Sequence, residues 1–355
     1  FINKRIKLIM AYTTINKSTD YFNTKLYTGN GSAGHGITGV GHQPDWVWIK
    51  NRQSTHWHQT YDAVRGTSSG ALYTNQNSAE DYMSGNGLAS FNSDGFTVNS
   101  NDGCNSNGEN LVAWNWKANG SSTTTNNDGA TTSYISHNST AQFSIIKYTG
   151  TGSNTNIGHG LNGTPDCFIT KGYSGATDWH LWNNSFTVNQ RIKINSTGGV
   201  TTNTSIFPAL PDATKIYLGS GGDVNQSGIQ YICYAWKNVT GYSKFGSYTG
   251  NGSSDGTFVY TGFKPAFVMI KRTDDAANWS MVDSKRDTYN SAIKRLFPDL
   301  TNAENTSLDP FVDLVSNGFK LQASSTAYNG SGGSYIYMAF GQSIVGSNNI
   351  PATAR

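Results

Sequence analysis

The short motif Tyr-Thr-Gly-x-Gly occurs three times in the chain, beginning at Tyr27, Tyr148 and Tyr248. A proline follows each tyrosine 17 positions later, and a lysine follows each proline after six more positions. The prolines are Pro44, Pro165 and Pro265, and the lysines are Lys50, Lys171 and Lys271. This constant spacing indicates that one structural blueprint has been copied in tandem.

The copies also end alike, in LVAWNWK, YICYAWK and YIYMAFG. Each covers roughly 100 residues, which is longer than a solenoid repeat and suits a whole domain with its own core. We expect an N-terminal arm at 1–21, a Ser/Thr/Asn/Gly-rich linker at 121–142 and a C-terminal tail at 344–355. The three repeats are expected at 22–120, 143–243 and 245–343. Met10 resembles a natural start, so that residues 1–9 would be an upstream addition.

The composition favours strands over helices. Only 13% of the residues are charged, but 12% are aromatic, and 40 glycines stand between short apolar segments. Turn signals such as SGNG and NSDG divide each repeat into about eight to ten strands. We therefore expect an all-β chain of three tandem antiparallel β-sandwiches of jelly-roll or concanavalin-like type. One helix is expected around 290–300, where Ile293, Leu296 and Phe297 have helical spacing.

Charge and cysteine content exclude several classes of protein. A net charge of +3 is too small for the basic face that nucleic-acid binding needs. No apolar run approaches 18 residues, so we expect no membrane insertion, and the opening segment shows no export signal. Cys104, Cys167 and Cys233 form no C-x-x-C pair. We expect buried thiols, with one bridge between Cys167 and Cys233 left open.

Reactive side chains do not follow the repeat, which argues against a repeated active site. The histidines show no threefold correspondence, and the three glutamates, Glu80, Glu109 and Glu304, are isolated from one another. Glycoside hydrolysis usually needs two carboxylates about 5–10 Å apart. Neither G-x-S-x-G nor H-E-x-x-H occurs. We predict a protein that is not an enzyme, with no catalytic residue and no cofactor.

The remaining candidates for chemistry are a histidine pair and the repeated lysines and tryptophans. His56 and His58 would lie on one face of a strand and are a weak candidate for a metal site. The repeated lysines are expected as strand-end charges that discourage edge pairing. The tryptophans Trp57, Trp179 and Trp279 follow the lysines by seven or eight positions and are expected in the core.

Aromatic residues outside the shared pattern are better candidates for ligand binding, because recognition on a duplicated scaffold tends to lie in its variable segments. Planar side chains there could stack on a sugar ring, with asparagine and serine supplying hydrogen bonds. We predict Tyr73, Tyr82, Trp182 and Tyr289 as ligand-binding residues.

The whole frame resembles a repeat domain of marine bacteriophages that is regarded as a virion structural or tail-fibre-like component. The residues that carry the resemblance are 143–165 (FSIIKYTGTGSNTNIGHGLNGTP), NSDGFTV, SNGFKL and YAWK. The second repeat departs from the pattern with KIYLGSGGDV, and the third ends in AFGQ. The resemblance implies a lectin-like β-sandwich fold and a virion context rather than a mechanism.

Together these features predict a non-enzymatic virion protein, assembled in the host cytoplasm, that acts as a tail fibre or surface appendage. Its expected partners are a host surface glycan or receptor and other virion proteins. A homotrimer is one option, because fibres are often trimers, although no heptad stalk or collagen-like run enforces it. The alternative is a bacterial carbohydrate-binding or adhesive repeat protein, and a third option is a fibre that also cleaves capsule.

Overall fold

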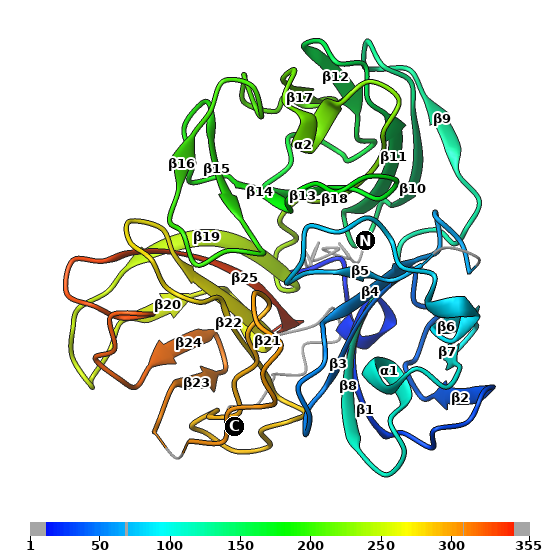
Figure 1. Cartoon of the computed structure of the whole chain (residues 1–355). Coiled ribbons are helices and arrows are strands. Elements are labelled where there is room, and N and C mark those ends of the chain that lie inside the picture. The colour runs from blue at the N-terminus through cyan, green and yellow to red at the C-terminus, as the bar shows by residue number, and fades with distance from the viewer. Residues whose placement is uncertain (1–11, 68–69, 308, 344–355) are drawn as a thin grey trace, which may run out of the picture.

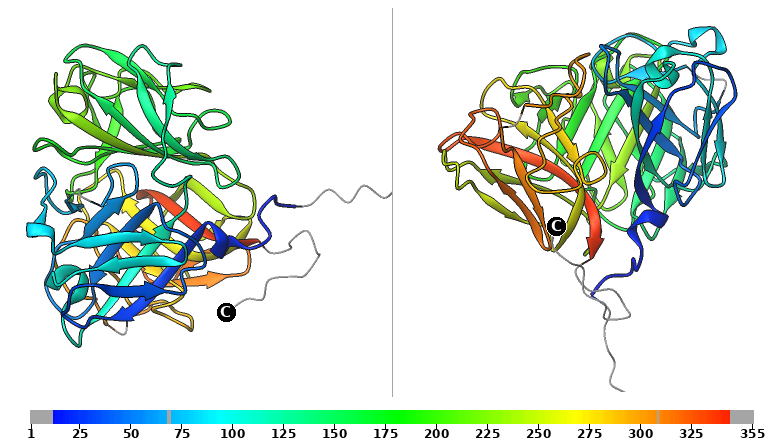
Figure 2. Two further views of the ribbon diagram at one scale, coloured as in Figure 1. Left: turned by 90° about the vertical axis from the view of Figure 1, so that its right-hand side faces the viewer. Right: turned by 90° about the horizontal axis from the view of Figure 1, so that it is seen from below.

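The computed structural model describes residues 12–67, 70–307 and 309–343, so that residues 1–9 and the tail at 344–355 lie outside it. Antiparallel sheets make up the fold, and the helices are single turns. Figure 1 shows three lobes around a common centre, one for each sequence repeat. Figure 2 shows the same lobes from two further directions. The helices of the described ranges are too short to span a lipid bilayer.

The three repeats share a similar order of strands, but two extra strands precede the shared strands of the second repeat, and a short helical turn precedes the last strand only in the first two. The first repeat comprises η1 (Ser18–Asp20), β1 (Phe22–Thr28), β2 (His35–Thr38), β3 (Trp46–Asn51), β4 (Gln59–Asp62), β5 (Leu72–Tyr73), η2 (Met83–Gly85), β6 (Leu88–Asn92), β7 (Gly95–Val98), α1 (Asp102–Asn105) and β8 (Asn110–Trp116). The second comprises β9 (Thr124–Asn126), β10 (Ser133–Asn138), β11 (Phe143–Thr149), β12 (Thr155–Gly158), β13 (Cys167–Gly172), β14 (His180–Asn183), β15 (Gln190–Lys193), β16 (Thr201–Thr202), β17 (Lys215–Leu218), α2 (Gly222–Asn225) and β18 (Gln230–Trp236). The third comprises β19 (Ser243–Thr249), β20 (Phe258–Tyr260), β21 (Phe263–Arg272), β22 (Ser280–Asp283), β23 (Val312–Val315), β24 (Gly318–Leu321) and β25 (Ser334–Ser343).

The largest sheet of each repeat has the same order of neighbours. The order is β1-β8-β3-β4 in the first repeat, β11-β18-β13-β14 in the second and β19-β25-β21-β22 in the third. The first strand of each repeat thus pairs with the last, and Phe22, Phe143 and Ser243 lie opposite Trp116, Trp236 and Phe340. A smaller sheet accompanies each: β2-β7-β6, β12-β17 and β20-β24-β23. Buried apolar side chains from both sheets form local cores in the first and third repeats, which gives the fold its β-sandwich character.

The repeated Tyr-Thr-Gly motif fastens the first strand of each repeat to the segment before the last. The hydroxyl of Tyr27 donates to the carbonyl of Cys104, that of Tyr148 to Val224 and that of Tyr248 to Tyr328, at 2.7, 2.7 and 2.6 Å. The next residues along, Asn105, Asn225 and Asn329, accept through Oδ1 from the backbone N–H of residues 30, 151 and 251. The motif therefore has a structural role in holding each repeat together.

One hydrophobic cluster joins the three repeats at the centre of the molecule. Trp46 of the first repeat stacks on Tyr234 of the second, with ring centroids 4.4 Å apart. The ring of Phe340 in the third repeat packs against those of Trp116 and Trp236, with ring centroids 5.7 and 6.5 Å apart. The first and third repeats have the local cores described above, and in addition the large sheets of all three repeats pack against each other and share this central cluster.

The repeated lysines lie at the boundaries between repeats, not at exposed strand ends. Lys50, Lys171 and Lys271 are fully buried. Each ammonium donates to a carbonyl oxygen of the preceding repeat around the centre: Thr301, Asn77 and Thr197, at 3.1, 3.3 and 2.7 Å. The strand-end prediction was wrong because the surface that these residues would expose is covered by the neighbouring repeat.

The segment 121–142, expected as a linker, contains two strands. β9 pairs with β10, and β10 pairs with β11 along the edge of the sheet of the second repeat. Ser133 and Ile135 of β10 are buried, whereas Tyr134 between them is exposed. This alternation is the period-2 pattern of a half-buried strand, so the Ser/Thr richness reflects β-structure instead of an unstructured linker.

The expected helix at 290–300 is absent from the described residues there. Ala292 and Leu296 form isolated bridges to Val312 and Met281. The carboxylate of Asp287 accepts from the backbone N–H of residues 293 and 294, which takes up donors that a helix would use. The strand count is eight in the first repeat, eight in residues 143–243 and seven in the third.

The three cysteines are buried free thiols, as expected. The open question of a bridge is answered by register, since Cys233 lies opposite Thr170 and Cys167 lies opposite Trp236. Burial raises the pKa of Cys233 to about 12, so this thiol is protonated at neutral pH.

Candidate functional site

A pocket of about 400 Å³ opens on the surface of the first repeat. The segment before β4, the end of β5, the start of η2 and the first turn of α1 form its walls. These residues line it: Thr55, His56, Trp57, Gln59, Tyr73, Asp81, Met83, Asn101, Asp102 and Gly103. Its size falls within the range that small-molecule and sugar pockets occupy.

Two aromatic rings form one wall of the pocket. Trp57 is 43% exposed and lies on Tyr73, with ring centroids 4.6 Å apart and planes at 58°. Tyr73 itself is buried, and its hydroxyl donates to Oδ2 of Asp81 at 2.8 Å. Tyr73 therefore fixes the indole from behind while the exposed indole surface is available to a ligand.

Amides and carboxylates form the opposite wall. Nε2 of Gln59 donates to Oδ1 of Asn101 at 2.7 Å, and the same oxygen caps α1 through the N–H of Gly103. A Cβ at Gly103 would lie 2.1 Å from Nε2 of Gln59, so a larger residue there would displace the Gln59 amide from its present position. Asp81 and Asp102 add carboxylates, and the lining contains no lysine or arginine. The wall offers planar acceptors and donors beside an aromatic surface.

The same place in the second repeat is filled by ion pairs. Gln59 pairs with Tyr73 in the first repeat, and His180 pairs with Lys193 in the second, so Gln59 and His180 occupy corresponding positions. Trp57 thus corresponds to Asp178, which accepts from the ammonium of Lys193. Nε2 of His180 lies 3.0 Å from Oδ2 of Asp223. The exposed tryptophan is therefore specific to the first repeat, and the shared frame does not require it.

The His180 cluster is the one group of metal-ligand type found within the described ranges. Ligand atoms of Asp178, His180 and Asp223 lie within 4.8 Å of one another. The hydrogen bond from His180 holds the pKa of Asp223 down at about 2, and burial lowers the pKa of His180. A neutral imidazole on Asp223 and the Lys193 ammonium on Asp178 already satisfy both carboxylates. We therefore interpret the cluster as structural.

The predicted histidine pair is split between two environments. His56 lines the pocket, whereas His58 is fully buried and its Nδ1 accepts from the indole of Trp48 at 3.0 Å. Burial lowers the pKa of His58 well below its usual value, so the ring is neutral. Both residues precede β4 instead of lying on it, and a shared metal would require His58 to give up its tryptophan partner.

The four predicted ligand-binding aromatics do not come together. Tyr73 lines the pocket. Tyr82 is exposed, with its hydroxyl on Glu80, and lines a second pocket of about 370 Å³ that shares Met83 with the first. Trp182 is buried and stacks on Phe168, with ring centroids 5.4 Å apart, so it cannot reach a ligand. Tyr289 is 83% exposed and stands alone.

The sequence predicted Trp57 in the core, but its side chain is exposed. Its counterparts were expected to be Trp179 and Trp279, but His58 holds their position. The backbone N–H of His58, Trp179 and Trp279 donates in each case to the side chain of residue 75, 195 or 299. The spacing of seven rather than eight residues after Lys50 was the available signal, because one residue changes the face of a strand.

A family model described as a domain of unknown function (DUF7483) matches residues 17–343. No curated protein and no solved structure matches the chain.

Proposed function

Because the chain belongs to this family of unknown function, DUF7483, we propose its function from its own residues: three copies of one jelly-roll or concanavalin-like sandwich carry a glycan-binding site on the first copy. The matching strand orders and registers support the copying. We propose further that the protein is a non-enzymatic virion component, a tail fibre or surface appendage. Its resemblance to marine phage repeat domains supports that context.

The single observation that carries the glycan proposal is the exposed Trp57 at the mouth of the pocket. A large aromatic surface costs free energy when it stays in water, and the fold does not need it, since the second and third repeats place Asp178 and Asn278 there. Sugars present one apolar ring face and several hydroxyls. The indole surface and the polar wall of Asn101, Asp81 and Asp102 match those two properties.

The test is a glycan array probed with the full chain and with a Trp57→Asn variant. Asparagine is the residue that the third repeat carries at this position, so folding should be unaffected and the unfolding midpoint should match wild type. We expect the variant to lose at least about tenfold in affinity, the equivalent of about 1.4 kcal/mol, for the glycans that wild type binds. A Tyr289→Ala variant is the matched control, because it removes an exposed aromatic outside the pocket, and it should bind like wild type.

If the Trp57→Asn variant binds glycans as tightly as wild type, the proposal that this pocket is the glycan-binding site is refuted. The virion context is tested separately by proteomics of purified particles from a phage that encodes the chain, where its absence would refute that part. Secretion or polysaccharide-utilisation genes beside the coding gene would instead favour an adhesive bacterial protein. New reducing ends after incubation with host polysaccharide would favour a fibre that cleaves capsule.

A further inference from the structure

The outer face of the small sheet in the third repeat carries two exposed aromatic side chains in a row. Phe258 and Tyr260 on β20 are 46% and 53% exposed, and Val259 between them is buried. Side chains two residues apart on a strand point to the same face, about 7 Å from one another. We call Phe258 and Tyr260, with their flanking lysines Lys244 and Lys320, the aromatic platform.

The platform is held in place by its neighbours. Phe258 lies opposite Lys320 and Tyr260 lies opposite Gly318 on β24. A Cβ at Gly318 would lie 2.1 Å from the carbonyl oxygen of Val259 and 3.0 Å from the ring of Phe258, so the backbone approach requires glycine there and the ring lies directly against it. Lys244 of β19 donates to the carbonyl of Tyr260 at 2.9 Å, and its ammonium lies 5.3 Å from the ring centroid of Tyr260.

Comparison with the other repeats separates the platform from the scaffold. The buried centres of the corresponding strands are Ile37, Ile157 and Val259, which lie opposite Phe96, Ile216 and Phe319. On either side of these centres the first repeat has Gly36 and Thr38, and the second has Asn156 and Gly158. The fold is built without aromatics at these positions, so their presence in the third repeat calls for a separate reason.

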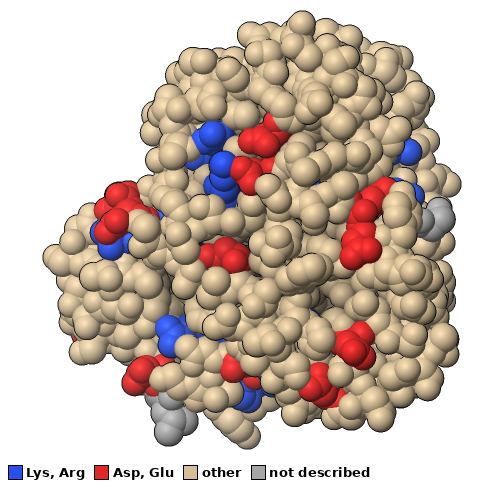
Figure 3. All heavy atoms as spheres, viewed as in Figure 1, with Lys and Arg blue, Asp and Glu red and all other residues tan. Residues whose placement is uncertain are grey.

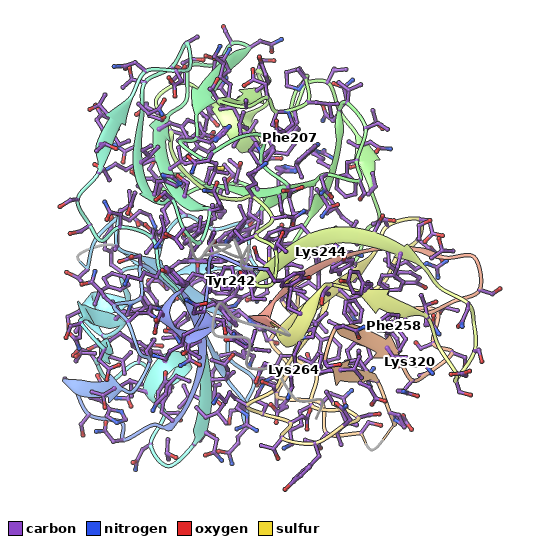
Figure 4. The ribbon with its side chains drawn as sticks, turned by 180° about the vertical axis from the view of Figure 1, so that it is seen from behind. Phe207, Tyr242, Lys244, Phe258, Lys264 and Lys320 are labelled. Carbon is purple, nitrogen blue, oxygen red and sulfur yellow. The ribbon has the colours of Figure 1, made fainter. Side chains whose placement is uncertain are left out.

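The charges beside the rings indicate an anionic ligand. Figure 4 shows Lys320 next to Phe258 and Lys244 above them on this side of the molecule. Lys320 pairs with Asp255, whose side chain is 84% exposed. An ion pair this exposed stabilises the fold little, so exchanging Asp255 for a ligand carboxylate or sulfate costs little. The nearby carboxylate of Asp313 already accepts from Ser291 and Gln322.

We propose that the aromatic platform binds an anionic polysaccharide chain, as a site separate from the Trp57 pocket. Successive sugar rings lie on Phe258 and Tyr260, and their acidic groups contact Lys320 and Lys244. Two exposed rings along one strand suit successive units of a polymer, whereas the pocket suits a short unit. Two sites on one chain also raise the avidity for a surface that presents both ligands.

The experiment measures binding of the full chain to dextran sulfate and to neutral dextran, which share one backbone. Wild type should bind dextran sulfate at least about tenfold more tightly, which corresponds to about 1.4 kcal/mol. A double variant, Phe258→Asn with Tyr260→Thr, carries side chains that the other repeats have at these positions. It keeps both lysines and should lose about tenfold or more in affinity for dextran sulfate with an unchanged unfolding midpoint.

Two further variants separate charge from stacking. Lys244→Gln with Lys320→Gln should reduce the preference for the sulfated polymer and the dependence of binding on salt. Trp57→Asn should leave binding to dextran sulfate unchanged, so that failure of the platform and failure of the pocket are distinguishable. Equal affinity for both dextrans, equal binding of single-stranded DNA, or full binding by the aromatic double variant would each overturn the proposal.

Discussion

Single side chains join the repeats to one another. Lys50, Lys171 and Lys271 are fully buried and donate to carbonyl oxygens of neighbouring repeats. Burial lowers the pKa of Lys171 to about 7, and the pKa values of Lys50 and Lys271 to about 8. Burying the charged form of each lysine therefore costs more free energy than burying the neutral form.

This gives a prediction for the pH dependence of stability. The ordinary pKa of lysine is 10.5, so between about pH 7 and pH 10.5 the unfolded chain binds the Lys171 proton that the folded chain has lost. The contribution of Lys171 is thus least favourable below pH 7 and improves as pH rises. Relative to a Lys171→Met variant, wild type should gain up to about 1.4 kcal/mol of unfolding free energy per pH unit from pH 7 to 9.

Urea unfolding at several pH values measures that difference. A Lys147→Met variant is the control, because Lys147 lies on β11 and is only half buried, and its curve should run parallel to that of wild type. If the Lys171→Met and wild-type curves also run parallel, the ammonium of Lys171 is not carrying the cost that its burial implies.

At the scale of elements, the turn after each first strand depends on two glycines with different roles. A Cβ at Gly150 would lie 2.2 Å from the carbonyl oxygen of Gln226, so the backbones approach too closely for any side chain. Gly152 has a φ of +77°, in the left-handed region that favours glycine. The Tyr-Thr-Gly-x-Gly motif is therefore fixed by space at its first glycine and by conformation at its second.

We predict that Gly150→Ala lowers the free energy of unfolding by about 1–3 kcal/mol, because the carbonyl in its way belongs to the backbone and cannot move alone. Gly36→Ala is the matched control, since a Cβ there meets nothing within 4 Å and φ is ordinary. Chemical denaturation of both variants checks this. Equal stability of Gly150→Ala and wild type would show that the turn can open without loss.

The sequence predicted those elements whose pattern is local. The recurring motif, the predominance of strands and the buried thiols followed from spacing and composition. The predictions of a linker at 121–142 and a helix at 290–300 were wrong because residues in both segments pair with other strands or form isolated bridges to them. The position of those strands cannot be read from the local sequence. Trp57 was misassigned since a shift of one residue moves a side chain to the opposite face of a strand.

The candidate site was recovered only in part. Tyr73 belongs to the pocket, but the indole that faces the ligand is Trp57, and Trp182 is part of the core. The aromatic platform was not foreseen, because Phe258 and Tyr260 lie after the third Tyr-Thr-Gly-x-Gly motif, in a segment to which no site residue was assigned. Its significance appears only when corresponding strands are compared and two of three lack aromatic residues.

At the scale of the whole molecule, the contacts between repeats follow a cycle. The hydroxyl of Tyr234 in the second repeat donates to Asp62 of the first, at 2.9 Å. The indole of Trp114 in the first repeat donates to the corresponding Asp283 of the third, at 3.1 Å. On the face that Figure 3 shows, charged groups are few and scattered. Apolar contact at the centre, more than surface charge, therefore holds the lobes together.

The N-terminal arm adds further contacts between the first and third repeats. The hydroxyl of Tyr12 donates to the carbonyl of Gly262 in the third repeat, and the N–H of Ser18 donates to the side chain of Gln342. Ile15 is buried in the central cluster. The beginning of the first repeat is thus tied to the end of the third.

Differential scanning calorimetry of the full chain tests the central claim, that three copies share one core and fold as one body. We predict a single transition whose van't Hoff and calorimetric enthalpies agree, at roughly 200 kcal/mol or more for a chain of this length. Separate transitions, or a van't Hoff enthalpy near the roughly 60–80 kcal/mol of a 100-residue domain, would contradict the claim, because each repeat would then unfold alone.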